Sequence, residues 1–132
     1  MGEKTNMNPW ELHVQKLDEA VAKVKGLEWK PGLATPHMRW VGPSGRFLRL
    51  GWSPSTNWAD AGELWIEMTE AEPYNWAIFS DTDGCVVVEH FPEDYMGERE
   101  EGTGDWESFS FPAPEAITRA WLWWQGQKEE NL

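Results

Sequence analysis

The chain has 132 residues, a net charge of −12 and one cysteine, and eleven of its residues are tryptophan. This length fits one domain with a buried core, so we expect residues 1–132 to form a single domain. The negative charge argues against a general nucleic-acid-binding protein, which needs cations to displace counterions from phosphate. Because Cys85 is the only cysteine, the chain forms no intramolecular disulfide and no multi-cysteine zinc site.

The sequence also lacks targeting and membrane signals. Its first residues contain no apolar run like that of a signal peptide, and no stretch approaches the roughly 18 apolar residues of a membrane span. We therefore expect a soluble intracellular protein without membrane contact. Residues 1–7 precede the first structural signal and are expected to form a flexible N-terminus.

The first predicted element is a helix between Asn8 and Gly26. Asn8 is a favourable N-cap residue, Pro9 suits the first helical position, and Gly26 favours the left-handed conformation that ends helices. Apolar residues recur every three or four positions, which places them on one face. These are Trp10, Val14, Leu17, Val21 and Val24.

Residues 37–52 are predicted to form a hairpin. The segments 37–41 and 46–52 are rich in aromatic and branched residues, and the glycines and proline between them favour a turn. A second helix follows, with Ser53 or Ser55 as its opening residue. Its apolar face consists of Trp58, Ala61, Leu64, Trp65 and Met68.

The second half of the chain begins with another predicted hairpin, whose strands lie at 74–79 and 85–91 around an Asp-Gly turn that needs positive φ. Residues 93–105 hold six acids, one base and three glycines, which indicates a mobile acidic loop. A fifth strand is expected over 106–111. The last helix opens at 112–115, and 128–132 are expected to be a short tail. Its apolar face consists of Ile117, Ala120, Trp121 and Trp124.

The predicted order of elements is α-β-β-α-β-β-β-α. Because hairpins dominate this order, we expect an α+β fold with a mainly antiparallel five-stranded sheet packed against helices, an α/β sandwich. Charge is divided along the chain. Residues 1–50 carry eight bases and five acids, whereas residues 51–132 carry three bases and eighteen acids. One side of the fold is therefore expected to attract anions.

Two segments carry a resemblance to a known family. The first is Trp52–Leu64, which reads WSPSTNWADAGEL, and the second is Ala113–Leu122, which reads APEAITRAWL. In order and spacing they resemble the Ser-Thr-Asp segment and the closing helix of the phage ABA sandwich domain family. The resemblance implies a small bacteriophage or prophage protein with an α/β sandwich, working in the cytoplasm of a bacterial host cell. It implies no catalytic residue.

The sequence contains no convincing catalytic or metal-binding motif. Cys85 lies beside a turn glycine at the start of a valine-rich strand, where a small buried cysteine is common. Residues 81–84 resemble the start of a calcium loop, but position 6 is Val86 instead of glycine and position 12 is Pro92 instead of glutamate. We therefore predict a protein without catalytic residues, without a metal site and without a cofactor.

The strongest candidate site combines arginines, tryptophans and a helix start. Arginine supplies forked donors for phosphate, tryptophan stacks on a base, and a helix N-terminus presents free amides to an anion. Strand alternation would point Arg46 and Arg49 to opposite faces, and an exposed strand face with capping residues is the plainer interpretation. The candidate ligand-binding residues are Arg39, Trp40, Arg46, Arg49, Trp52, Ser53, Ser55, Thr56 and Asn57.

Ten of the eleven tryptophans divide into two groups, and Trp52 is counted with the candidate site. Trp10, Trp58, Trp65, Trp121 and Trp124 fall on predicted core faces of helices, whereas Trp29, Trp40, Trp76, Trp106 and Trp123 have no assigned core position. Packing is the commoner role of each one. Surplus aromatic residues also anchor interfaces and stack ligands. Their number therefore favours a ligand cleft or a homo-oligomer.

Two functional hypotheses follow. The first is a non-enzymatic phage accessory protein that binds and sequesters a small anionic, nucleotide-derived signal of bacterial defence. The second is an acidic protein-protein inhibitor of a host protein, with DNA mimicry by the acidic segment as one form. A third of the acids of residues 51–132 fall in the glycine-rich loop, which counts against an ordered row of charges.

Overall fold

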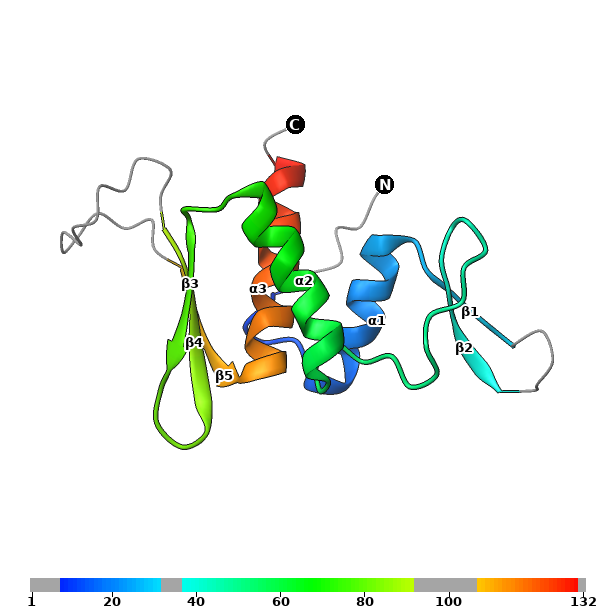
Figure 1. Cartoon of the computed structure of the whole chain (residues 1–132), viewed down its shortest axis with the longest axis horizontal. Coiled ribbons are helices and arrows are strands. Elements are labelled where there is room, and N and C mark those ends of the chain that lie inside the picture. Colours follow the sequence, from blue (N-terminus) through cyan, green and yellow to red (C-terminus); the bar gives the residue numbers. More distant parts are fainter. Residues whose placement is uncertain (1–7, 32–36, 92–106, 131–132) are drawn as a thin grey trace.

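The structure is a computed structural model, and it describes residues 8–31, 37–91 and 107–130. It is an α+β fold whose two antiparallel sheets lie at opposite ends with the helices between them (Figure 1). The elements are α1 (Val14–Lys25), β1 (Glu28–Pro31), β2 (Met38–Val41), α2 (Trp58–Ala71), β3 (Trp76–Ser80), β4 (Cys85–His90), β5 (Glu107–Pro112) and α3 (Ala113–Glu130).

The α-β-β-α-β-β-β-α pattern is the predicted one, but one of its strands differs from the prediction and the single five-stranded sheet is wrong. The strands form a three-stranded sheet with the order β3-β4-β5 and a separate two-stranded sheet made by β1 and β2. The segment 46–52 is not a strand, since only Phe47 forms an isolated bridge, to Val41. Its predicted place in the order is taken by β1, which lies outside the predicted hairpin.

The three-stranded sheet is built on the predicted Asp-Gly turn. Asp83 and Gly84 both adopt positive φ, 58° and 79°, as a two-residue hairpin turn with right-handed strand twist requires. The register places Val88 opposite Ile78 of β3 and Phe109 of β5. Since alternate residues of a strand share a face, Phe79 and Val87 lie opposite each other on one side of the sheet, and Ile78, Val88 and Phe109 lie together on the other side.

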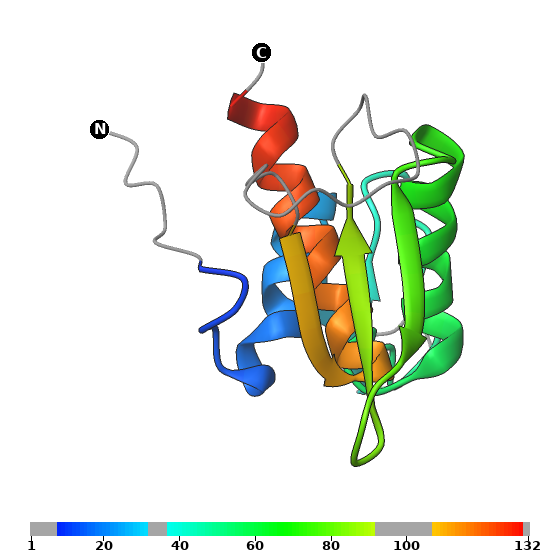
Figure 2. The ribbon, with the colours of Figure 1, turned by 90° about the vertical axis from the view of Figure 1, so that its left-hand side faces the viewer.

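Helices α2 and α3 cover that side of the sheet (Figure 2). Helix α3 packs against β4, β5, α1 and α2, so it is the centre of the molecule. Its predicted apolar face is confirmed, because all four of its residues are buried. The core joins the helices to the sheet; its large, almost completely buried side chains include Trp121, Phe109, Leu17, Leu64, Met68, Val21 and Val88.

The first helix begins later than the sequence predicts. Asn8 closes a single turn, since its side chain accepts from the amide of Trp10 and its carbonyl accepts from Leu12. The helix itself starts at Val14 with His13 as N-cap. Buried Arg119 holds the preceding segment by donating to the carbonyl oxygens of Pro9 and Leu12 at 3.1 and 2.7 Å. The predicted end at Gly26 is confirmed, with φ 73°.

Other boundaries also differ from expectation. Asn57, not Ser53 or Ser55, caps α2, because its side-chain oxygen accepts from the Asp60 amide at 3.1 Å. Helix α3 continues to Glu130, so the predicted tail at 128–132 starts too early. The expected flexible N-terminus at 1–7 lies outside the described residues, as do the acidic loop at 93–105 and Trp106.

The tryptophans are distributed differently from the predicted division. Trp121 and Trp124 are buried as predicted, but Trp10 and Trp58 are exposed and Trp65 is half-buried. Trp10 lies before α1 and stacks on Phe109 with ring centroids 4.7 Å apart. Trp76, which had no assigned position, is in the core at 8% exposure. The helical pattern therefore identified the residues of α3 better than those of the first two helices.

Replacing Gly62 and Gly84 by alanine should change stability in opposite directions. Gly62 lies in the interior of α2, and nothing approaches within 4 Å of an added Cβ. Gly62→Ala should raise the free energy of unfolding by up to about 1 kcal/mol through helix propensity. Gly84→Ala should lower it by about 1 kcal/mol, because alanine is strained at φ 79°. Urea unfolding measures both changes in free energy. Changes of the same sign would contradict the placement of Gly62 in a helix interior and of Gly84 in a turn with positive φ.

Two buried tryptophans provide a second test. The indole N–H of Trp124 donates to Glu72 at 2.8 Å, whereas the buried indole N–H of Trp121 has no acceptor among the described residues. Both Trp→Phe changes remove part of a ring, but only Trp124→Phe removes a hydrogen bond to a charged group. It should cost about 1 kcal/mol more than Trp121→Phe in urea unfolding. A larger cost for Trp121→Phe would contradict this.

Candidate functional site

Most of the predicted ligand-binding residues lie on or next to a projection that we call the arm, residues 28–52. Its described parts are β1, β2 and the connection from Gly42 to Trp52, and it forms the end of the molecule beyond α1 (Figure 1). The arm carries four basic residues and one acidic residue, a net charge of +3, which leaves −15 on the rest of the chain. It is therefore a cationic element on an acidic protein.

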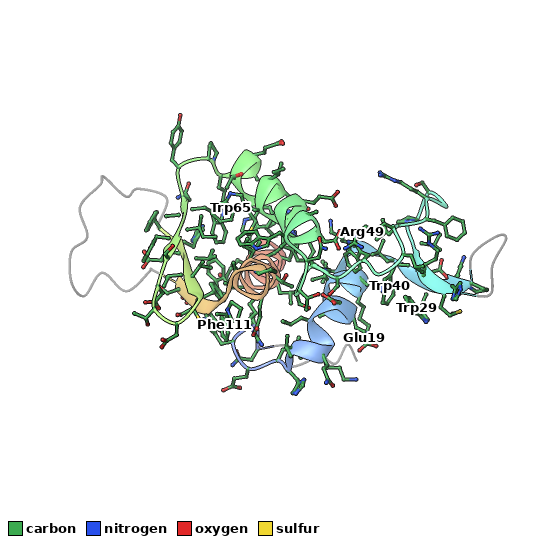
Figure 3. The ribbon with its side chains drawn as sticks, turned by 60° about the horizontal axis from the view of Figure 1, so that its bottom comes forward. Glu19, Trp29, Trp40, Arg49, Trp65 and Phe111 are labelled. Atoms are coloured by element: carbon green, nitrogen blue, oxygen red, sulfur yellow. The ribbon has the colours of Figure 1, made fainter. Side chains whose placement is uncertain are left out.

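A row of three indole rings runs along the arm. Trp29 of β1 is directly opposite Trp40 of β2, and their ring centroids are 5.0 Å apart. Trp40 meets Trp52 edge-on at 6.3 Å. Trp29 remains 53% exposed. Figure 3 shows Trp29 and Trp40 next to each other, with Arg49 further along toward the helices. The row gives the arm an aromatic face, and Trp52 at its end donates its amide to the carbonyl oxygen of Arg49 at 3.1 Å.

The connection from the arm to α2 is held by a set of residues that we call the polar junction, Asp18, Arg49, Ser53, Ser55 and Asp60. Asp60 is buried and accepts from the Ser53 amide at 2.8 Å and from Arg49 at 2.5 Å. Asp18 of α1 accepts from the Ser53 hydroxyl at 2.6 Å and from the Ser55 amide at 2.9 Å. Two carboxylates thus join α1, the arm and the start of α2.

These carboxylates occupy the donors that were predicted to receive an anionic ligand. A helix start attracts negative charge, because its first amides lack helical acceptors. Here Asp60 lies in the first turn of α2, and Thr56 is hydrogen-bonded to Ser53 at 2.7 Å. The predicted chemistry is present, but the bound anions are side chains of the protein. An external anion would have to displace them or use other groups.

The three predicted arginines do not converge. The Arg39 guanidinium donates to the carbonyl oxygen of Leu48 and lies over the Phe47 ring at 5.6 Å, so it braces the arm from within. Arg46 follows the turn at 42–45, is exposed, and makes no ion pair with any described residue. Arg49 is paired with Asp60 but its side chain remains 48% exposed. Only Arg49 combines a fixed position with access to solvent near the indole row.

The structure therefore assembles Trp40, Trp52, Arg49 and Ser53 and separates Arg39 and Arg46 from them. Sequence reasoning missed three contributors. Trp29 was missed because β1 was not recognised as a strand. Asp60 follows the Asn57 cap by three residues, which is a readable capping signal. Asp18 belongs to α1, and no local signal in the sequence links it to Ser53.

A second polar cluster lies at the opposite end of the core. His90 Nε2 is 2.8 Å from Glu72, and its ring contacts Trp76 and Trp123 at centroid distances of 4.6 and 5.0 Å. Glu72 also accepts from Trp124. His90 and Glu72 bond to each other, and Glu72 also bonds to Trp124, so we assign this cluster a packing role.

The described part of the chain contains neither a metal-binding cluster nor a membrane-spanning helix. No group of three or more histidine, cysteine or acidic side chains is arranged to hold a metal ion within residues 8–31, 37–91 and 107–130. In the same residues, none of the helices has both the length and the apolar character needed to cross a membrane. Cys85 is a half-buried free thiol.

Comparisons of the chain with protein-family models, with curated proteins and with solved structures each returned no match.

Removing the Asp60 carboxylate should weaken the polar junction measurably. Asp60→Ala leaves the Ser53 amide and Arg49 without their acceptor, and it removes a favourable charge at the start of α2. We expect a loss of about 2 kcal/mol in the free energy of unfolding. Glu63→Ala is the matched control, because Glu63 is an exposed acid of the same helix, and it should change stability by less than about 0.5 kcal/mol. Similar losses in urea titrations would argue against the junction.

Proposed function

We propose that this chain is a non-enzymatic binding protein that holds a small anionic, nucleotide-like ligand on the aromatic face of the arm. The observation that carries the proposal is the indole row of the arm, in which Trp29 is exposed and Trp40 and Trp52 are half-buried, together with the half-exposed guanidinium of Arg49. A planar base stacks on an indole, and stacking is worth about 1–3 kcal/mol per base. A phosphate group takes the forked donors of arginine.

The charge distribution supports this choice of ligand. The arm is the cationic part of an otherwise acidic chain, so an anion approaching the molecule is drawn to the arm and repelled elsewhere. Arg49 uses Nε, Nη1 and Nη2 in contacts with Asp60 and with the carbonyl oxygen of Leu50. Since a guanidinium has five N–H donors, it keeps donors for a ligand phosphate without leaving the polar junction.

The resemblance of Trp52–Leu64 and Ala113–Leu122 to the phage ABA sandwich family supports a biological setting. On that basis the ligand is a nucleotide-derived signal of bacterial defence, and sequestration in the host cytoplasm is the effect. Binding without turnover is sufficient for sequestration. This fits a site made of stacking and charge, in which no residue is assigned to bond making or breaking.

The alternative, a DNA-mimicking inhibitor, has less support on the described surface. DNA carries one negative charge per about 1.7 Å of axis. Of the acids of α2, Asp60 pairs with Arg49 and Glu67 with Lys25. The exposed Glu63 and Glu70 are seven residues apart, about 10 Å along a helix. Such spacing does not reproduce a phosphate backbone.

Isothermal titration calorimetry tests the proposal. Cyclic dinucleotides, cyclic trinucleotides and ADP-ribose are the probes, and the bound ligand is recovered and checked for chemical change. We expect Trp29→Ala to weaken binding of the preferred probe by about tenfold or more, as stacking energies imply. Arg49→Lys keeps the charge but loses the fork, so it should weaken phosphate binding several-fold.

Tyr74→Ala is the matched control, since Tyr74 is an aromatic residue that is 89% exposed but lies between α2 and β3, outside the arm. It should leave ligand affinity unchanged. Failure of every probe to bind, or recovery of an altered ligand, would contradict the proposal. Equal losses in Trp29→Ala and Tyr74→Ala would show that the arm is not the binding surface.

A further inference from the structure

Helix α2 presents a second exposed apolar surface. Trp58, Gly62 and Ile66 follow one another at four-residue spacing, which places them along one side of the helix. Trp58 and Ile66 are 60% and 55% exposed. Nothing lies within 4 Å of the position of a Cβ on Gly62, so the glycine leaves an open gap between two apolar side chains. Large exposed apolar residues grouped in this way mark interaction surfaces.

This surface has an acidic border. Helix α2 contains no basic residue, and Glu63 and Glu70 lie three residues before and four residues after Ile66, on the same side of the helix. Both are exposed, and neither forms an ion pair with any residue that the structure describes. The other two acids, Asp60 and Glu67, are neutralised by Arg49 and Lys25. An apolar centre with free carboxylates around it fits a basic, aromatic partner.

The arm of the same protein has that chemistry. Trp29 and Met38 are exposed, and the register of β1 and β2 places them on the same face of the two-stranded sheet as Trp40. Arg46 supplies a positive charge without an ion-pair partner among the described residues. Aromatic residues, methionine and arginine are the types enriched in interface cores.

We propose that the arm of one copy docks on the α2 surface of a second copy. The arm points away from α2 in its own molecule (Figure 1), so the contact forms between chains. The charges are complementary, because an arm that keeps a net charge of +2 after Arg49 is set against Asp60 meets a helix whose exposed Glu63 and Glu70 carry negative charge. This inference rests on the proposed function in taking the arm as the binding surface. It adds that ligand and second copy compete for the same aromatic face.

Sedimentation velocity of the full chain over a range of concentrations tests the docking. We expect reversible association whose Kd rises at least tenfold from low to high salt, because the contact is partly electrostatic. Gly62→Arg fills the gap with a cation and should abolish association, while the open space around Gly62 leaves the fold intact. Gly126→Arg is the matched control, since it adds the same side chain at an open helical glycine of α3 and should associate normally.

A mixing experiment distinguishes this contact, which joins the arm of one chain to α2 of another, from a contact in which the same surface of both chains meets. Trp29→Ala has a defective arm and an intact α2 surface, whereas Gly62→Arg has the reverse. Each variant alone should be monomeric, and a 1:1 mixture should form a two-chain species. A wild-type chain that stays monomeric at every concentration would overturn the inference, as would association that Gly62→Arg leaves unchanged. Nucleotide binding by Gly62→Arg tests the proposed function separately, because its arm is intact.

Discussion

The placement of the arm depends on the polar junction. Asp18 and Asp60 bring two carboxylates to the start of α2, where amides without helical acceptors and the Arg49 guanidinium receive them. These bonds replace the water or ligand that a helix start would otherwise bind. The same contacts set the position of α1 against α2 and fix where the chain leaves the arm. A site that was expected to receive a ligand is thereby a structural joint.

The fold uses its tryptophans in three ways. Trp76, Trp121 and Trp124 fill the space between the sheet and the helices, where large flat rings build a core from few residues. Burial leaves the indole N–H of Trp76 and of Trp121 without acceptors among the described residues, so part of the gain from burying these rings is lost to desolvation. Trp10 closes the edge of β5. In the arm, Trp29 is more than half exposed, whereas Trp40 and Trp52 are half-buried and Trp52 also packs against the core.

The elements that were predictable from the sequence are those specified by local signals. Helix α3 has a regular apolar face, and the turn at Asp83 and Gly84 requires positive φ, so both were found. Strand β1 has four exposed residues and ends at Pro31, and nothing in its sequence identifies its pairing with β2. The segment 46–52 has strand-like composition, but two of its carbonyl oxygens accept from side chains. Arg39 donates to Leu48 and Arg49 donates to Leu50, and no extended ladder forms. The candidate site divides in the same way. Residue types near Trp40 and Arg49 were predictable, whereas the contribution of Asp18 depends on how α1 packs.

The arm is stable only because of what it touches. A two-stranded sheet is marginal in water, and here it is braced by Arg39 within the arm and by Arg49 through the polar junction. Its aromatic face contributes less to this stability than it would if buried, because Trp29 is more than half exposed. A ligand or a second chain that covers Trp29 removes apolar surface from water and stabilises the arm by mass action. Binding and stability of the arm are therefore coupled, and any molecule that binds this face also stabilises the arm.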